Sequence, residues 1–443
     1  MNAIRSLFNR RFPRGGLKRS VSILAGGTVM AQVIAFAVSP ILTRLYRVDD
    51  FGYLQIFNSI VAVLLVVVAG RYEMAIPLPE DDNTAVNLLG FALCVVLGTS
   101  SLTAIAVIVC PFIPWVVAHT GMLLGYLWLI PICLAGAGFY QSFSYWSLRK
   151  KQFALVARTR IIQVASRFVV QLGAALLKFG MPGLLLGETI ARANGTGAFV
   201  RGFVQGYRPL LAELRWRKMV SAARRYKHFP LVFSPSGLLN AATLAVPTLM
   251  LAAFFGPTVT GWFALVDRVL GIPSVLIGQS LQQVYVSEGA PMVHSDPVGL
   301  KRLFEKMLRK IYLIPIITCA FLTLFGPTVF AFVFGEKWRE AGEYARILAF
   351  VDIVGLLVAP IEMTLTMLEL QNWRLAWDGG RLILVSGAML VAHALLPGAK
   401  PVIGAYAACM MLGYVVLLAV SYIAINQLIA RTARVPSPSD SRT

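Results

Sequence analysis

The strongest constraint on this chain is the length of its apolar blocks, because each is about as long as a bilayer core is thick. The first block, 21–44, runs for about 24 residues, and a helix needs roughly 20 to cross the hydrocarbon core. The blocks are apolar on all sides, whereas a helix in a soluble protein keeps a polar face. Charged residues make up 14% of the sequence, against about 25% in soluble domains. The sequence therefore predicts an all-α polytopic membrane protein.

Counting the blocks predicts about twelve transmembrane helices. Their expected limits are 21–44, 51–70, 84–112, 121–147, 153–177, 181–205, 229–256, 258–285, 311–334, 343–370, 375–396 and 401–428. The longest polar interruption divides them into six and six, and two halves with even span counts are expected to be parallel repeats. The predicted domains are a basic N-terminus at 1–20, a six-helix lobe at 21–206, a basic linker at 207–228, a second six-helix lobe at 229–430 and a disordered tail at 431–443.

The distribution of Lys and Arg predicts the orientation. With the N-terminus inside, about 26 of the 40 basic residues fall in cytoplasmic segments and about seven fall outside. Both termini are therefore expected in the cytoplasm, with the first apolar block retained as a helix. In this orientation the short charged stretch between the first two blocks, which contains Arg44, Arg47, Asp49 and Asp50, is the first outer turn.

Several function classes find no support in the sequence. The net charge of +20 comes without an aromatic-basic module, so we attribute it to the cytoplasmic loops of a membrane protein and expect no nucleic-acid partner. The five cysteines and four histidines show no ligand-like spacing, so no metal or other cofactor is predicted. A P-loop, a nucleophile elbow and a zinc-protease motif are absent, as is any loop large enough for a catalytic domain. We therefore expect a protein that is not an enzyme.

The fifth predicted span, which contains RTRIIQVASRFVVQL, carries a polar stripe. Arg160, Gln163, Arg167 and Gln171 follow each other at i, i+3, i+7 and i+11, so they share one helix face. Arg160 and the neighbouring Arg158 could extend to the cytoplasmic headgroups. Arg167 lies about 20 Å from the start of the span, too deep for that explanation. An ionised side chain at this depth usually faces a cavity or a partner, and we predict that Arg167 lines a polar cavity.

Three other spans contribute candidates. Arg268 lies near the middle of the eighth span, next to Asp267, so a structural ion pair and a cavity lining are both consistent with the pattern. Gln32 in the first span and Asn240 in the seventh occupy matching places in the two halves. Uncharged polar residues at such places more often join helices than bind a ligand. Their matching placement nevertheless suggests that the two helices face a common space.

Two charged pairs are predicted to be structural. Glu188 and Arg192 are spaced i, i+4, and Asp378 and Arg381 are spaced i, i+3, so each pair can neutralise itself locally. The membrane residues left without a predicted partner are Arg160, Arg167, Arg268, Asp352 and Glu362. This surplus is basic, which suits an anionic cargo such as a phosphate or diphosphate headgroup.

The first hundred residues resemble a known family. The stretch SPILTRLYRVDDFGYLQIFNSI, followed by GRYEMAIPLPEDDNTAVNLL, is similar to the opening of bacterial O-antigen and exopolysaccharide flippases. These form the polysaccharide-transporter branch of the multidrug/oligosaccharidyl-lipid/polysaccharide (MOP) exporter superfamily. The later stretch ALVDRVLGIPSVLIGQSLQQVY is similar to the eighth helix of that family. The four matching ionisable positions are Arg44, Arg71, Glu73 and Arg268.

The resemblance implies two six-helix lobes in a V around a central cavity. It also implies a cargo of undecaprenyl-diphosphate-type lipid-linked oligosaccharide, moved from the cytoplasmic to the outer leaflet of the bacterial inner membrane. Membrane lipids, and the polysaccharide polymerase machinery, would then be partners. Arg44 and Arg71 join the candidate cargo-binding residues on this basis, although a structural anchor explains Arg44 equally well.

The energy source is not visible in the sequence. Asp267, Asp352 and Glu362 could carry a coupled proton or cation, and no spacing favours one of them. Two alternative functions stay open. A cation-coupled multidrug exporter of the same superfamily would favour an acidic or aromatic cavity. A membrane-embedded glycan polymerase or ligase would favour a large outer loop, which the expected topology lacks.

Overall fold

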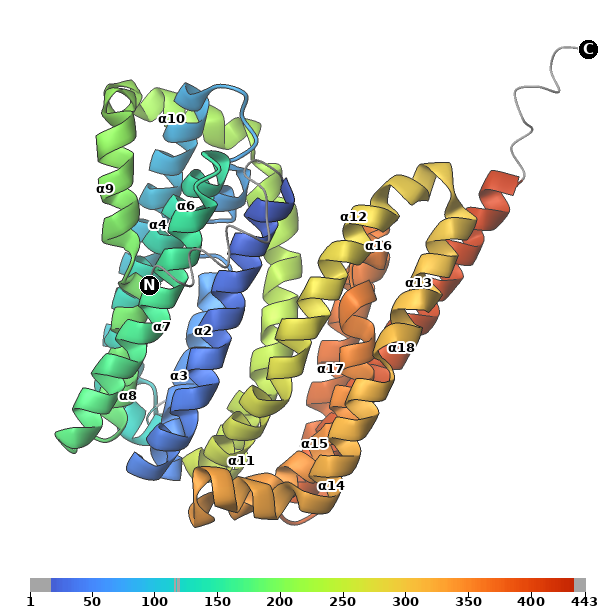
Figure 1. Cartoon of the computed structure of the whole chain (residues 1–443). Helices are drawn as coiled ribbons and strands as arrows, with labels where there is room; N and C mark the ends of the chain where they lie inside the picture. The colour runs from blue at the N-terminus through green and yellow to red at the C-terminus, as the bar shows by residue number, and fades with distance from the viewer. Residues whose placement is uncertain (1–16, 115–116, 118–119, 434–443) are drawn as a thin grey trace, which may run out of the picture. The chain divides into compact units, whose positions relative to one another are not determined.

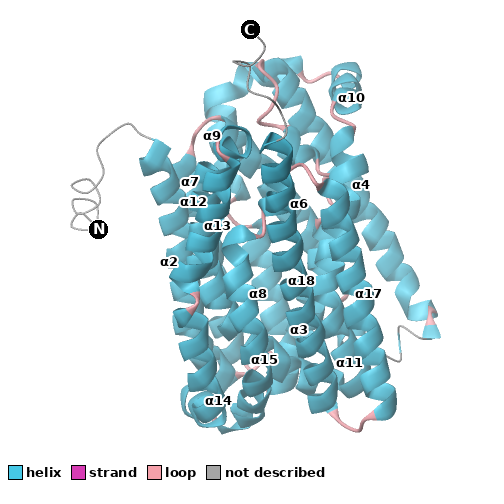
Figure 2. Cartoon of the chain, turned by 90° about the vertical axis from the view of Figure 1, so that its right-hand side faces the viewer, coloured by secondary structure: helices cyan, strands magenta, loops and turns pink. Residues whose placement is uncertain are grey.

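The computed structural model describes residues 17–114, 117 and 120–433, and within these residues the chain is helical without a strand (Figure 2). Most of the predicted basic N-terminus and most of the predicted tail lie outside the described residues, and α2 (Leu17–Leu45) begins within the predicted N-terminus. The chain divides into two compact units, Met1–Ala241 and Ala242–Thr443. Each unit is a set of packed helices (Figure 1). The prediction of an all-α polytopic fold is thereby confirmed.

The long helices of the first unit follow the first six predicted spans. They are α2 (Leu17–Leu45), α3 (Val48–Leu65), α4 (Asp82–Val109), α6 (Leu129–Arg149), α7 (Phe153–Leu176), α8 (Met181–Ala193) and α9 (Thr196–Tyr207). The sixth predicted span is divided between α8 and α9, because Gly195 has a φ of 92°, which a helix does not tolerate. Short 3₁₀ segments include η1 (Tyr72–Ala75) and η4 (Arg208–Glu213).

The charged stretch between the first two spans forms a tight turn. α2 ends at Leu45 and α3 begins at Val48, and the backbone N–H of Arg47 donates to Asp50 Oδ2 at 3.0 Å. The side chain of Arg47 forms an ion pair with Asp49 at 3.2 Å. A carboxylate in the first turn of a helix also complements its dipole. The acidic residues therefore start α3 and reverse the chain between two antiparallel helices.

Small residues bring the helices of the first unit close together. A Cβ atom at Gly27 of α2 would lie 2.7 Å from the Cβ of Ala157 on α7. At Gly183 of α8 it would lie 2.4 Å from the Cβ of Ala174 on α7. Helices in lipid gain stability from such close backbone approach, because the hydrophobic effect does not drive their association there. The α2–α7–α8 packing therefore positions the polar stripe predicted on the fifth span.

The helices of the second unit follow the last six predicted spans. They are α11 (Ser234–Pro273), which begins in the first unit, α12 (Gln279–Ser295), α13 (Pro297–Ile311), α14 (Leu313–Phe334), α15 (Arg339–Val358), α16 (Thr364–Met367), α17 (Gln371–Leu395) and α18 (Ala399–Ala433). π-helical segments η5 (Phe229–Phe233) and η6 (Ser274–Gly278) precede and follow α11. Gly256, with a φ of 79°, interrupts α11 at the predicted boundary between spans seven and eight.

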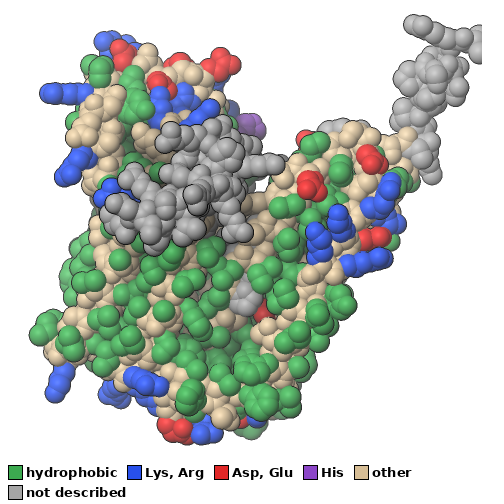
Figure 3. All heavy atoms as spheres, in the orientation of Figure 1, with side chains coloured by type: hydrophobic (Ala, Val, Ile, Leu, Met, Phe, Trp, Pro, Cys, Tyr) green, Lys and Arg blue, Asp and Glu red, His purple; other side chains and the backbone are tan. Residues whose placement is uncertain are grey.

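Eight stretches of the described residues are long and apolar enough to cross a membrane. α6, α7 and the α8–α9 pair occupy three further predicted spans. In Figure 3, hydrophobic side chains cover the middle of the helices and charged side chains gather toward their ends. The chain is thus a multi-pass membrane protein.

Two helices lie in segments predicted to be cytoplasmic connections. α10 (Trp216–Arg225) and α13 are amphipathic and basic. α13 buries Leu300, Phe304 and Met307 on one side and exposes Arg302 and Lys306 on another. The basic linker at 207–228 therefore contains the 3₁₀ segment η4 and the helix α10.

Candidate functional site

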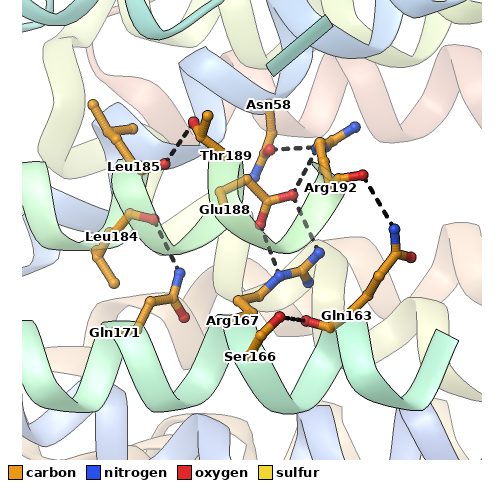
Figure 4. A network of polar contacts seen from close by, with 10 residues as sticks. All are labelled: Asn58, Gln163, Ser166, Arg167, Gln171, Leu184, Leu185, Glu188, Thr189 and Arg192. Atoms are coloured by element: carbon orange, nitrogen blue, oxygen red, sulfur yellow. Dashed lines mark hydrogen bonds and ion pairs between the residues drawn. The ribbon is translucent and has the colours of Figure 1, made fainter. Parts of the chain in front are cut away.

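The polar stripe of α7 faces α8 over most of its length. Gln163 Nε2 donates to the carbonyl oxygen of Arg192 at 3.2 Å, and Gln171 Nε2 donates to that of Leu184 at 3.1 Å. Between these two bonds Arg167 reaches Glu188, as Figure 4 shows. The stripe therefore shares one helix face, as predicted, and that face joins two helices.

Glu188 is the centre of this polar network. Its side chain is 4% exposed, and its carboxylate forms ion pairs with two arginines. Arg167 Nε lies 2.9 Å from Oε2, and Arg192 Nε lies 2.8 Å from Oε1. Arg192 also donates from Nη2 to Asn58 Oδ1 on α3 at 3.0 Å (Figure 4). Two guanidinium groups thus share one carboxylate, so the network carries one net positive charge.

A glycine makes this arrangement sterically feasible. A Cβ atom at Gly187 would lie 2.4 Å from Cγ of Gln171 and 3.1 Å from the carbonyl oxygen of Arg167. Only a residue without a side chain lets α7 approach α8 this closely. The ion pairs of Glu188 depend on that approach, since Arg167 reaches it from the other helix.

The structure corrects one prediction for this region. The Glu188–Arg192 pair is confirmed, but the prediction that Arg167 lacks a partner is wrong, because Arg167 pairs with the same carboxylate. The prediction weighed only pairs within one helix. A sequence signal existed, since Glu188 is the only acidic residue between Asp82 and Glu213. A single carboxylate in that stretch is a natural partner for arginines that the same helices bury near it.

Arg160 differs from Arg167. Its Nη1 donates to Thr28 Oγ1 on α2 at 2.6 Å, and within the described residues no carboxylate lies at ion-pair distance from it. The side chain is half-buried. Gln32, also half-buried, lies one helical turn beyond Thr28 on α2. Arg160 is thus a cation whose charge its described neighbours leave uncompensated.

The remaining candidates of the first unit are two arginines at helix ends and one amide residue. Arg44 is exposed in the last turn of α2. Arg71 is half-buried, has a φ of 60° and donates from Nη1 to the sulfur of Met74 at 3.8 Å. Asn240, on the α11 segment that belongs to this unit, is half-buried. Their roles in cargo binding stay predictions.

Among the acidic candidates of the second unit, Glu362 forms an ion pair, and Asp267 and Asp352 differ in exposure. Glu362 Oε1 pairs with Arg374 at 2.7 Å, so the prediction that Glu362 is without a partner is wrong. Arg374 lies twelve residues further on, beyond the spacing of a helical pair. Asp267 is exposed, whereas Arg268 and Asp352 are half-buried.

Glu362 belongs to a second polar network, whose other members lie on α17. Arg374 pairs with Asp378 at 3.2 Å, and Asp378 pairs with Arg381 at 3.5 Å, which confirms the predicted Asp378–Arg381 pair. The guanidinium of Arg381 stacks on the ring of Trp377 at 4.2 Å. This network holds two carboxylates and two guanidiniums and is neutral, in contrast to the network around Glu188.

Two polar residues of the first unit, Asn58 and Gln141, escaped the sequence predictions, and the burial of Glu73 was not predicted either. Asn58 holds Arg192, Gln141 on α6 donates to Glu73 Oε1 at 3.2 Å, and Glu73 is buried with 1% exposure. Glu73 was noticed only through the family resemblance. An acidic residue next to an apolar block, with no basic residue three or four positions away, was the signal for a buried carboxyl.

Comparison with solved structures defines the class of fold. An inward-facing multidrug-resistance MATE family transporter of the MOP superfamily has a TM-score of 0.67 at 14% identity, covering 91% of this chain and 99% of its own. A MOP superfamily transporter from Pyrococcus furiosus, with a binding pocket described as having reverse polarity, has a TM-score of 0.59 at 14% identity, covering 94% and 97%. The MATE multidrug transporter DinF-BH has a TM-score of 0.61 at 17% identity, covering 91% and 94%. This chain has the transporter fold of the MOP superfamily.

The sequence itself identifies the family. The family described as "Polysaccharide biosynthesis protein" matches residues 41–343, and the chain belongs to it. No curated protein matches the sequence. Together with the fold, this membership confirms the resemblance to the polysaccharide-transporter branch of the superfamily.

Proposed function

We propose that this chain is a flippase that moves a polyprenyl-diphosphate-linked oligosaccharide from the cytoplasmic to the outer leaflet, for surface polysaccharide synthesis. The bacterial inner membrane, with both termini in the cytoplasm, is the corresponding location. The observation that carries the proposal is the surplus of positive charge on α7. On α7 and the adjoining α8, Arg167 and Arg192 share one carboxylate, Glu188, and Arg160 bonds to Thr28 without a carboxylate partner among the described residues.

The charge surplus fits a diphosphate better than a cationic drug. A guanidinium offers two parallel N–H donors, which match the oxygens of a phosphate. Arg160 offers them without a competing carboxylate among the described residues. The side chain of Arg167 is 30% exposed while it pairs with Glu188, so the side chain is not fully enclosed. A site for cationic compounds would instead need an excess of acidic or aromatic groups.

The proposed mechanism assigns binding to arginines and movement to the lobes. Arg160 and Arg167 hold the diphosphate, Gln163 and Gln32 supply further polar contacts, and Arg268 and Asn240 contribute from α11. Arg44 and Arg71 are the remaining proposed cargo-binding residues. The lipid tail stays in the bilayer while the two lobes alternate between inward and outward access. No bond is made or broken, so the chain acts as a transporter and not as an enzyme.

The test of the cargo class is genetic. Deletion of the gene should deplete a surface glycan and leave lipid-linked oligosaccharide on the cytoplasmic leaflet, with little change in drug susceptibility. Normal surface glycan together with sensitivity to cationic dyes would contradict the proposal and support a drug exporter.

The test of the site compares two arginines of α7. Arg160→Ala should reduce glycan export per inserted molecule roughly tenfold or more, since a hydrogen bond to a charged group contributes about 1.5–3 kcal/mol. Arg160→Lys should rescue export partly, because it keeps the charge but loses the planar pair of donors. Arg158→Ala is the matched control, since Arg158 lies on the same helix and is exposed. Equal export by both alanine variants would remove Arg160 from the site.

A further inference from the structure

Glu73 is a buried carboxyl group with an incomplete set of partners. It is 1% exposed, and among the described residues no Lys, Arg or His lies within ion-pair distance of it. Gln141 Nε2 donates to Oε1 at 3.2 Å. Oε2 is buried and has no hydrogen-bond partner in the described part of the chain. An ionised carboxylate is seldom buried in this way, because desolvation favours its neutral form.

The surroundings of Glu73 are mostly apolar. α4, α6 and η5 pack against η1. Val86 and Leu89 of α4, Phe143 of α6 and Phe229 of η5 belong to the apolar cluster that contains Ala75. Among the described residues, neither α4 nor η5 contributes a charged side chain that interacts electrostatically with Glu73.

The nearby charged and titratable groups come from η1, α6 and α7. Arg71 precedes Glu73 on the same turn and attracts its negative charge. Tyr145 of α6 lies within electrostatic range of Glu73, Arg71 and Arg160. Burial raises the pKa of Glu73 to about 7, and the backbone N–H of Glu73 and the charge of Arg71 offset only part of this effect. At neutral pH both the protonated and the ionised form of this carboxyl are therefore populated.

Arg71, like Glu73, has a buried polar atom without a hydrogen-bond partner among the described residues. Its Nε is buried without a hydrogen-bond partner among the described residues, and its backbone is held in the left-handed region. Its Nη2 lies against the first turns of α11, where a Cβ atom at Gly237 would come within 2.2 Å. A non-glycine residue in this conformation is strained and persists only where the surroundings impose it. Arg71 thus stands between the unpaired carboxyl and the helix that continues into the second unit.

We propose that Glu73 is a proton-binding site, in which the neutral carboxyl is held by Gln141 and the ionised carboxylate is held by Arg71. On release, the O–H bond breaks, its electron pair stays on the carboxylate, and the proton passes to water. The new negative charge then draws the Arg71 guanidinium toward Glu73 and away from Gly237. Proton binding in η1 thereby acts on α11, the helix that joins the two units. The site differs from Asp267, Asp352 and Glu362, which the sequence offered for ion coupling, and its proton binding does not depend on the identity of the cargo.

The test uses the purified full-length chain in lipid nanodiscs and follows the infrared C=O stretch of protonated carboxyl groups from acid to mildly alkaline pH. The wild-type chain should lose one protonated carboxyl with a midpoint near neutral pH. Glu73→Gln, which has the shape of the neutral form, should lack this component. Glu80→Gln is the matched control, because Glu80 is exposed in the following turn, and it should keep the component.

A second variant keeps the test decisive if Glu73→Gln fails to fold. Arg71→Met retains the carboxyl and removes the charge that favours its ionised form, so the midpoint should move to higher pH. Persistence of the neutral-pH component in Glu73→Gln would overturn the proposal. An unchanged midpoint in Arg71→Met would overturn it too. These outcomes leave the cargo proposal untouched, because the titration is measured without cargo.

Discussion

Glu73 and Glu188 are both buried carboxyl groups of the first unit, yet their surroundings differ. Glu188 lies between two guanidiniums at 2.8 and 2.9 Å, whereas Glu73 has one amide donor and an unpartnered oxygen among the described residues. Burial penalises both charges, and only Glu188 receives enough opposite charge to offset the penalty. The comparison teaches that burial alone does not assign a role to a carboxyl group. Its partners do.

The difference in surroundings also assigns the two carboxyl groups different roles, a structural one for Glu188 and a titrating one for Glu73. A carboxylate shared by two arginines stays ionised and holds α7 to α8. A buried carboxyl without an ion pair favours its neutral form, so its pKa is raised into the range where it can gain or lose a proton near neutral pH. We therefore expect changes at Glu188 to affect stability at every pH, and changes at Glu73 to affect its dependence on pH.

The largest effect is expected for Glu188→Gln. Removal of the shared carboxylate leaves Arg167 and Arg192 without compensation, which costs about 3–5 kcal/mol for a buried pair. The side chains of Arg167 and Arg192 are 30% and 22% exposed, and we place the loss near the lower end of this range. Unfolding of the purified chain in detergent at pH 7 measures it. Stability equal to that of the wild type would show that the network does not hold the two helices.

The second effect is the pH dependence caused by Glu73. Its pKa in the folded chain, about 7, is raised above the ordinary value of 4.5, so folding favours the neutral form. This contribution to stability is fully present below pH 4.5 and is lost as the pH rises through about 7. The loss amounts to about 2–3 kcal/mol.

The free energy of unfolding measured across this window checks the prediction. Glu73→Gln cannot ionise and should show no loss from this site, while Glu80→Gln should follow the wild type. The same change in stability between pH 4.5 and pH 7 in all three proteins would contradict the prediction and assign the pH dependence to other groups.

The smallest effect is expected for Asn58→Ala. Its amide oxygen accepts one hydrogen bond from Arg192, and the ion pair of Arg192 with Glu188 remains. A hydrogen bond to a charged group contributes about 1.5–3 kcal/mol, and partial exposure of Arg192 favours the lower value. The same unfolding measurement applies. A loss as large as that of Glu188→Gln would mean that Asn58, and not the carboxylate, organises the network.

Much of the fold followed from hydropathy, because a bilayer requires long apolar helices. The helix limits of α7, predicted at 153–177 and observed at Phe153–Leu176, show how closely composition marks a span. The break at Gly195 and the amphipathic helices α10 and α13 were not predicted. A single left-handed glycine and a short amphipathic helix change the average hydropathy little.

The site was less predictable than the fold. The i, i+4 pair of Glu188 and Arg192 followed from spacing, since the two side chains lie on one helix. Arg167 pairs with Glu188 from 21 residues away, and Arg374 pairs with Glu362 across a turn. Such contacts depend on which helices pack together. Periodicity shows which face is polar and not what that face meets.

The central claim is that arginines of α7 bind the diphosphate of a lipid-linked oligosaccharide during its transfer across the membrane. Its most direct test is the transbilayer movement of a polyprenyl-diphosphate oligosaccharide in vesicles that contain the purified chain, measured as the fraction that becomes accessible to an added lectin. We expect the wild-type chain and Arg158→Ala to increase this fraction above that of protein-free vesicles, and Arg160→Ala to do so roughly tenfold more slowly. Movement at the protein-free rate with the wild-type chain, or an unchanged rate with Arg160→Ala, would contradict the account.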